Sequence, residues 1–267
     1  MSTSVTFVCI SDTHGLHDTL SLPPGDVLLH AGDLTVNGTL AELQSFAAWW
    51  HRQPFKEKFV VAGNHDRVLD AERSVTDAPT YSSAETEKEE ESRLSTPLHV
   101  HAAALLTSDS STYLLDRAAA TQLGSFVVWG SPWTPRFWGA FQADRGDAIA
   151  KHWAAIPAQV DVILTHCPAA GHRDWVPRVQ QNVGCIELRK VVLERRPAVH
   201  VCGHIHEGGG GVSWEQDVAF VNAALCGRGY AATAHMPVVF SLTRTPGAEP
   251  EVSVTFEDPA HRREKER

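Results

Sequence analysis

The 267-residue sequence predicts an α/β fold in which two sheets pack together. Short apolar runs typical of buried strands recur along the chain, and most of them end beside Gly or a polar residue. Stretches with the apolar spacing of helices lie between these runs, and this interspersion is typical of layered α/β proteins. Three more strand-like runs follow late in the chain, which suggests that a second sheet packs on the first.

The N-terminal part of the chain is expected to begin with two strands, a helix and a third strand. The strands are predicted over residues 5–10, 27–31 and 59–62. The helix is predicted over residues 40–50, because Leu40, Leu43, Ala47 and Trp50 recur at helical spacing, and Thr39 is its expected N-cap. The chain then becomes polar, acidic and aperiodic, so we expect a solvated insert at about residues 73–97.

The core pattern resumes after the insert and continues almost to the C-terminus. Helices are predicted over residues 146–155 and on a face marked by Cys185, Leu188 and Val192. Strands are predicted over residues 112–115, 125–130, 160–164, 198–202, 218–221, 238–242 and 252–256. Because no internal repeat or separating linker is visible, we expect one domain over residues 1–257, followed by a charged tail at 258–267.

The composition indicates which classes of partner are unsuited to this protein and in which cell compartment it is expected. A net charge of −9 argues against a broad duplex-DNA or anionic-membrane footprint, but it allows a small anionic substrate in a locally positive site. The N-terminus lacks a signal-peptide pattern and no apolar run has membrane length, so we expect a cytoplasmic protein. The cysteines are odd in number, widely spaced and without C-x-x-C, which predicts buried free thiols in a reducing compartment: Cys9, Cys167, Cys185, Cys202 and Cys226.

Five predicted strands end in side chains that can bind a metal ion. Open α/β sheets bind ligands at the carboxyl edge of their strands, so these side chains are expected to converge there. The Asp-x-His and His-x-His pairs are spaced by two residues, which places both side chains on one side of an extended segment. The set comprises Asp12, His14, Asp33, Asn64, His166, His204 and His206.

Each of these endings is weak evidence by itself. A lone His at a strand end is more often a hydrogen-bonded surface residue than a ligand, and a Gly-Asp pair is common in turns. Five such endings in one chain are harder to explain by turn chemistry. Together they indicate a dinuclear site with mixed imidazole, carboxylate and amide ligands.

The residues at these strand ends, and their order along the chain, resemble the metal-binding blocks of the calcineurin-like metallophosphoesterases. The blocks that carry the resemblance are Asp12-Thr13-His14, Gly32-Asp33, Gly63-Asn64-His65-Asp66, Thr165-His166 and Gly203-His204-Ile205-His206. Blocks at 129–135, 173–177, 183–188 and 203–208 resemble the branch of metallophosphoesterase-domain-containing, brain-type phosphodiesterases. The resemblance covers the chain roughly from Val5 to Leu242, but the acidic insert has no counterpart.

The resemblance implies a four-layer α/β/β/α sandwich of two mixed sheets flanked by helices. It also implies two divalent metal ions, with manganese as the first expectation and iron, zinc or magnesium also compatible. The implied ligands of the first ion are Asp12, His14 and His206. Those of the second are Asn64, His166 and His204, with Asp33 bridging both.

The activity implied by the resemblance is hydrolysis of small phosphodiesters, cyclic nucleotides among them. A hydroxide bridging the two metal ions would attack phosphorus, and His65 would assist catalysis and contact substrate together with Asn64. Asp66 is expected to orient His65, or else to cap the turn that follows it. An alternative function is that of a phosphomonoesterase or protein phosphatase, in which Arg67 would clamp the phosphate. A metal-binding scaffold with little turnover is the third reading.

The sequence predicts the residues that line the substrate site less clearly than it predicts the metal ligands. Trp133, Arg173, Asp174 and Trp175 lie in the branch-specific blocks, where they either line the substrate or pack the fold. His172 follows the His166 loop and shares that ambiguity. The sequence leaves open the physiological substrate, the metal identity and the oligomeric state.

Overall fold

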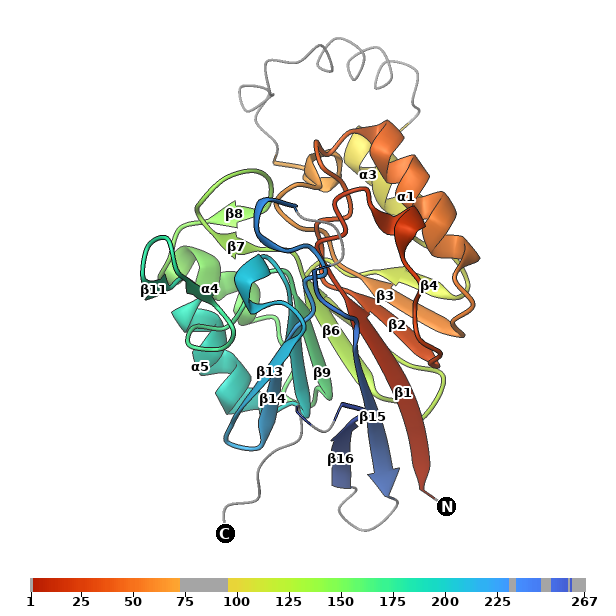
Figure 1. Cartoon of the computed structure of the whole chain (residues 1–267), viewed down its shortest axis with the longest axis vertical. Helices are drawn as coiled ribbons and strands as arrows, with labels where there is room; N and C mark the ends of the chain where they lie inside the picture. The colour runs from red at the N-terminus through yellow and green to blue at the C-terminus, as the bar shows by residue number, and fades with distance from the viewer. Residues whose placement is uncertain (1, 73–95, 231–233, 246–250, 259, 261–267) are drawn as a thin grey trace.

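The computed structural model describes residues 2–72, 96–230, 234–245, 251–258 and 260, which form two six-stranded mixed sheets (Figure 1). The first sheet has the order β16-β15-β1-β2-β3-β4. Strands β1 to β4 run parallel, and β15 and β16 are antiparallel additions at one side. The bounds are β1 (Thr3–Ile10), β2 (Val27–His30), β3 (Glu57–Val60), β4 (Ser111–Tyr113), β15 (Val238–Thr245) and β16 (Glu251–Phe256).

The second sheet has the order β13-β14-β12-β9-β6-β5. Its four central strands are parallel, while β13 and β5 pair antiparallel at the two edges. The bounds are β5 (Arg117–Ala120), β6 (Val127–Ser131), β9 (Val162–Thr165), β12 (Val199–Cys202), β13 (Gly211–Glu215) and β14 (Val218–Asn222). Two short ribbons complete the strands: β7 (Thr134–Pro135) with β8 (Gln142–Ala143), and β10 (Trp175–Val176) with β11 (Gln181–Asn182).

Helices cover the outer face of each sheet, as Figure 1 shows. α1 (Leu40–Arg52) and α3 (Leu98–Leu105) lie beside the first sheet, and α4 (Asp147–Trp153) and α5 (Ile186–Arg195) beside the second. Thr39 and Glu42 form a capping box at the start of α1, which confirms the predicted N-cap. Short 3₁₀ turns are η1 (His17–Thr19), η2 (Arg67–Leu69), η4 (His206–Gly208) and η5 (Arg228–Tyr230).

Three apolar layers hold these four layers of secondary structure together. Strand β1 shows the principle, because its alternate residues face opposite sides. Val8 and Ile10 pack toward α1, whereas Phe7 and Cys9 pack between the sheets. A third core joins the second sheet to α4 and α5. The predicted four-layer α/β/β/α sandwich is therefore confirmed.

The sequence missed elements whose apolar pattern is weak. Strand β5 is largely exposed at a sheet edge, and α3 and β13 were also not predicted. All five cysteines are buried and free, as expected. Most of the acidic insert (73–95) and most of the charged tail (259 and 261–267) lie outside the described residues.

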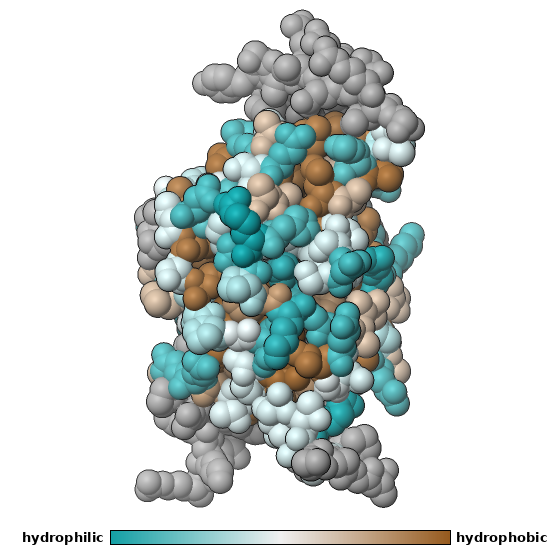
Figure 2. Space-filling view, turned by 90° about the vertical axis from the view of Figure 1, so that its right-hand side faces the viewer, coloured by the Kyte–Doolittle hydropathy of each residue, from teal (hydrophilic) through white to brown (hydrophobic). Residues whose placement is uncertain are grey.

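The outer surface is mixed in polarity. Figure 2 shows the face at the right of Figure 1, where polar and apolar side chains are interspersed. Over the described stretches, every helix is too short or too polar to cross a bilayer.

Candidate metal centre

The predicted ligands lie where the parallel strands of both sheets end. Ser11, directly after β1, pairs with Ala224, two residues beyond β14, so the ends of the two sheets are in contact. The backbone at this junction is unusual, because four of the predicted ligands adopt left-handed conformations: Asp12 (φ 53°), His14 (φ 39°), Asp33 (φ 57°) and His204 (φ 69°). Residues other than glycine rarely adopt this conformation, and such strain concentrates at functional sites.

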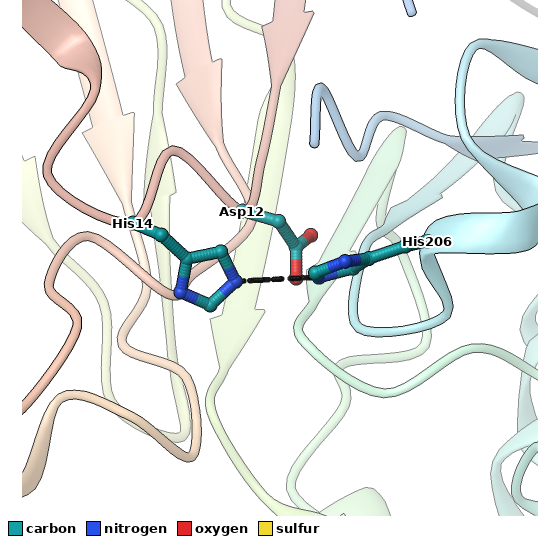
Figure 3. Close-up of side chains that lie close together, drawn as sticks. All are labelled: Asp12, His14 and His206. Atoms are coloured by element: carbon teal, nitrogen blue, oxygen red, sulfur yellow. Dashed lines mark hydrogen bonds and ion pairs between the residues drawn. The ribbon is translucent and has the colours of Figure 1, made fainter. Parts of the chain in front are cut away.

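The first cluster consists of Asp12, His14 and His206, which converge from two sides (Figure 3). The Nε2 atoms of His14 and His206 lie 3.2 Å apart. The Asp12 Oδ1 atom lies 3.2 Å from His206 Nε2 and 3.9 Å from His14 Nε2. These three ligand atoms are spaced as they would be around one small cation.

The second cluster consists of Asp33, His166 and His204, and Asn64 adjoins it. The Asn64 Oδ1 atom lies 3.0 Å from His166 Nε2. The Asp33 Oδ2 atom lies 3.4 Å from His166 Nε2 and 3.6 Å from His14 Nε2, a residue of the first cluster. A single carboxylate oxygen thus stands between the two clusters.

The ring orientation of three histidines fits metal binding. The Nδ1 atoms of His14, His166 and His206 face backbone carbonyls at 3.3, 2.8 and 3.2 Å. A carbonyl only accepts hydrogen bonds, so each Nδ1 donates a proton, and in the neutral ring each Nε2 offers a lone pair. The Nε2 atoms face one another and the carboxylates of Asp12 and Asp33, and this crowding of acceptors is relieved when a proton or a cation lies among them. The donor set therefore fits divalent metal ions.

The charges of the protein itself support the same reading. Burial disfavours the Asp33 carboxylate, but the neighbouring His166 outweighs this effect and holds the pKa of Asp33 well below its ordinary value. Burial likewise disfavours a charged His166, yet Asp33 raises the pKa of His166 to about 9. Burial lowers the pKa of His204 to about 3, so this imidazole is neutral and ready to coordinate. The buried carboxylates thus attract positive charge.

Two glycines allow the ligand loops to approach so closely. A Cβ atom on Gly63 would overlap Asp33 Oδ1, and one on Gly203 would overlap Asp12 Oδ2. Neither position therefore has room for a side chain. The glycines that end the predicted strands are needed for packing against the carboxylates.

His65 stands at the edge of this centre beside three residues that the sequence did not single out. Its Nδ1 donates to the Val36 carbonyl at 2.6 Å, and its Nε2 lies 3.2 Å from the Tyr230 hydroxyl. The Trp138 ring lies 4.9 Å from the His65 ring. Tyr230 and Trp138 belong to no recognised motif, so the sequence offered only their aromatic character as a signal. In the structure both are exposed large side chains.

The role expected for Asp66 is wrong. His65 faces Val36 instead of Asp66, and within the described residues the Asp66 side chain makes no capping hydrogen bond to η2. The Asp66 carboxylate instead accepts hydrogen bonds from the backbone of Leu34, Thr35 and Gly63, at 3.1, 3.0 and 2.8 Å. It fastens the Asp33 loop to the Asn64 loop, because these two loops have N–H groups that need a buried acceptor.

Other residues named from the sequence belong to neither cluster. Arg67 is only 4% exposed, so it offers little surface to a substrate. Trp133 stacks on His152 with ring centroids 3.9 Å apart, which supports the packing reading for this Trp. The four remaining residues contact neighbouring segments of the chain. Arg173 donates to the Gly208 carbonyl and His172 bonds to Glu215. Asp174 accepts from the backbone of Gly184, and Trp175 pairs with Asn182 in the β10–β11 ribbon.

Comparison with known proteins agrees with the fold. Residues 5–208 match the family model of the calcineurin-like phosphoesterases. The human Metallophosphoesterase domain-containing protein 1 is 38% identical over 242 residues, which are 88% of this chain and 70% of that protein. The solved phosphopantetheinyl hydrolase of Mycobacterium tuberculosis superposes with a TM-score of 0.55 at 12% identity, over 97% of this chain and 98% of that one.

A second solved structure, that of the Thermus thermophilus protein TT1561, has a TM-score of 0.52 at 13% identity, over 82% of this chain and 89% of that one. At such identities the two structures support the fold alone. The family model and the human relative go further, since they cover most of the chain. The chain belongs to the calcineurin-like phosphoesterases, and its clustered His and Asp side chains suit the divalent metal centre of such an enzyme.

Proposed function

We propose that this protein is a dinuclear metal-dependent phosphodiesterase, with manganese as the first expectation. Asp12, His14 and His206 would hold one ion, Asn64, His166 and His204 the other, and Asp33 both. The observation that carries the proposal is the position of Asp33 Oδ2, between His14 of one cluster and His166 of the other.

Bound divalent ions at this place would supply a water-derived nucleophile near neutral pH and offset the charge of the phosphate. The protein supplies the proton. Because Nδ1 of His65 keeps its proton on the Val36 carbonyl, only the doubly protonated imidazolium of His65 could donate a proton, and it would do so from Nε2 to the departing ester oxygen. The bond between phosphorus and that oxygen breaks as the oxygen takes the proton from Nε2. The nucleophile adds OH to phosphorus, so a phosphomonoester and an alcohol are released.

A diester is favoured over a monoester by what surrounds the two clusters. The side chain that kept the phosphatase alternative open, Arg67, is buried. A monoester dianion carries one more negative charge than a diester and gains most from an exposed arginine clamp. The retention of all seven predicted ligands and of His65 speaks for turnover over a scaffold role.

The test is an activity panel with metal-free protein and with protein reconstituted with manganese, iron, zinc or magnesium. Bis(p-nitrophenyl) phosphate, p-nitrophenyl phosphate and cyclic nucleotides represent diesters, monoesters and cyclic diesters. We expect the metal-loaded protein to prefer diesters and the chelated protein to be inactive, with metal content measured in parallel. Faster hydrolysis of the monoester, or undiminished activity without metal, would overturn the proposal.

A further inference from the structure

A cavity of about 390 Å³ lies beside the second cluster and is lined in part by His204. Two ribbons form its walls. Residues 136–141 join β7 to β8 on one side, and residues 177–180 form the tip of the β10–β11 ribbon on the other. The Phe137 ring approaches the His204 ring edge-on at 6.3 Å between centroids. The cavity therefore adjoins the second cluster at His204.

The first wall is fixed to the ligand Asn64. The backbone N–H of Ala140 donates to the Asn64 carbonyl at 2.8 Å. Gly139 has a φ of 89°, and a Cβ atom there would overlap the same carbonyl oxygen, so only glycine fits. The N–H of Phe137 donates to Gln142 at 2.5 Å. Although Phe137 is 74% exposed, its loop holds it at a set place relative to the metal ligands.

The remaining lining is apolar or positively charged, apart from the neutral amide of Gln181. Apolar contacts come from Pro135, Phe137, Pro168, Val176, Val179 and Ile205. Among the described residues that line the cavity there is no carboxylate, in a chain whose net charge is −9. Arginines 136, 145 and 178 also line it, and they differ in what they bind.

Two of these arginines are already engaged. Arg136 pairs with Asp144 at 2.6 Å, and Arg145 donates to the carbonyls of Val183 and Gly184 at 2.7 and 2.9 Å. Arg178 is exposed and makes no hydrogen bond or ion pair within the described part of the chain. A guanidinium placed at an apolar cavity next to a phosphoesterase centre suits an anionic group of the substrate.

The position of the cavity indicates which part of a substrate it would hold. His65 groups with His14 and Asp33, whereas His204 groups with His166 and Asp33, so the two imidazoles belong to different halves of a centre that share Asp33. If His65 protonates the departing alcohol, the group that stays on phosphorus lies on the His204 side.

We propose, on the basis of the phosphodiesterase function above, that this cavity selects the retained group of the substrate. The favoured group is a flat apolar ring that bears a second negative charge. The ring packs against Phe137 and Val179, and the charge meets Arg178.

The test uses three diesters that all release p-nitrophenol and retain a methyl, a phenyl or a 4-carboxyphenyl group. We expect kcat/KM to rise about tenfold from methyl to phenyl, through burial of the ring. We expect a further rise of about tenfold with the carboxylate, through a charge-assisted hydrogen bond.

Two variants assign these gains to residues. Phe137→Ala should reduce the phenyl-to-methyl ratio about tenfold, and Arg178→Gln should reduce the carboxyphenyl-to-phenyl ratio by a similar factor. Arg52→Gln is the matched control, because Arg52 is an exposed arginine at the end of α1 that pairs with Asp18. It should leave both ratios unchanged.

Failure of this inference is distinguishable from failure of the proposed function. Equal kcat/KM for the three diesters, or an unaltered carboxyphenyl-to-phenyl ratio in Arg178→Gln, would overturn the inference and leave the diesterase function standing. If metal-loaded protein hydrolysed none of the diesters, the diesterase function would fail. Calorimetric binding of phenyl phosphate and 4-carboxyphenyl phosphate then tests the cavity alone, and equal affinities in wild type and Arg178→Gln would overturn it.

Discussion

Asp33 is the residue on which both halves of the candidate centre depend. Its Oδ1 accepts a hydrogen bond from the backbone N–H of His65 at 2.9 Å, which leaves Oδ2 facing His14 and His166. One oxygen therefore anchors the carboxylate to the protein, while the other remains available to cations on both sides. His204, by contrast, belongs to one cluster alone.

This difference predicts unequal effects of two substitutions. Asp33→Asn should lose metal and activity more completely than His204→Gly, because an amide brings no charge to either ion. Metal content per protein and kcat/KM on a model diester measure both. Asp18→Asn, at an exposed carboxylate outside the centre, is the control. A larger loss in His204→Gly would contradict the bridging role.

His65 is predicted to act on the substrate without holding a metal ion. His65→Ala should lower turnover by roughly 10²–10⁴ while metal content stays nearly intact. The loss should shrink for a diester with a very acidic leaving group, which departs without a proton. His166→Ala should lose metal and activity together. Equal metal loss in the two variants would make His65 a ligand.

Individual residues also show where prediction from sequence stops. The ligand set was predictable because each member lies within four residues of the end of a buried strand. The direction of a side chain after the strand was not, since it depends on the turn geometry. Asp66 follows His65 in sequence but turns toward the N–H groups of Leu34, Thr35 and Gly63. Tyr230 reaches His65 from a segment far along the chain.

At the scale of elements, the strand ends decide the geometry of the centre. The strands that supply ligands are buried on both faces, so their apolar runs were easy to predict. The exposed edge strand β5 and the short helix α3 lack that signal, and the sequence missed both. The close contact between ligand loops requires glycine at the point where a strand ends.

Gly63→Ala is therefore predicted to disturb the metal centre without touching a ligand side chain. The added Cβ would overlap Asp33 Oδ1, so the carboxylate must move. We expect a stability loss of about 1–3 kcal/mol, as for overpacking elsewhere, together with weaker metal binding. Metal titration followed by calorimetry and urea unfolding measure these two effects.

Gly171→Ala provides the comparison for backbone strain alone. Gly171 has a positive φ, of 88°, but none of the described residues lies within 4 Å of its Cβ position. This variant should lose some stability and keep its metal affinity. If Gly63→Ala bound metal as tightly as wild type, close packing at Asp33 would not govern the centre.

At the scale of the whole molecule, the four layers bury polar groups as well as apolar ones. The layer order followed from the family resemblance, whereas the apolar runs only suggested that the late strands form a second sheet. In the structure two of those late strands, β15 and β16, belong to the first sheet instead. Two histidines outside the predicted ligand set, His30 and His200, are fully buried. His200 keeps a hydrogen bond to Thr165 Oγ1 at 2.8 Å.

These two histidines predict an acid-sensitive fold. Burial lowers the pKa of His30 and of His200 to about 3, whereas a histidine in an unfolded chain titrates near about 6.5. The unfolded chain therefore binds protons more readily than the folded one below pH 6.5. Stability is fully present above that pH and falls as the pH drops toward 3, by up to about 1.4 kcal/mol per pH unit for each residue.

Urea unfolding of metal-free protein between pH 7 and pH 5 measures this dependence, and chelation removes the contribution of bound cations. His200→Gln should unfold with a smaller loss of stability per pH unit than wild type, because one titrating imidazole is gone. Gln44→Ala is the control, since Gln44 is an exposed, uncharged residue on α1 and its loss should leave the slope unchanged. A His200→Gln variant with the wild-type slope would show that protonation of His200 does not oppose folding. The acid sensitivity would then have to come from other groups.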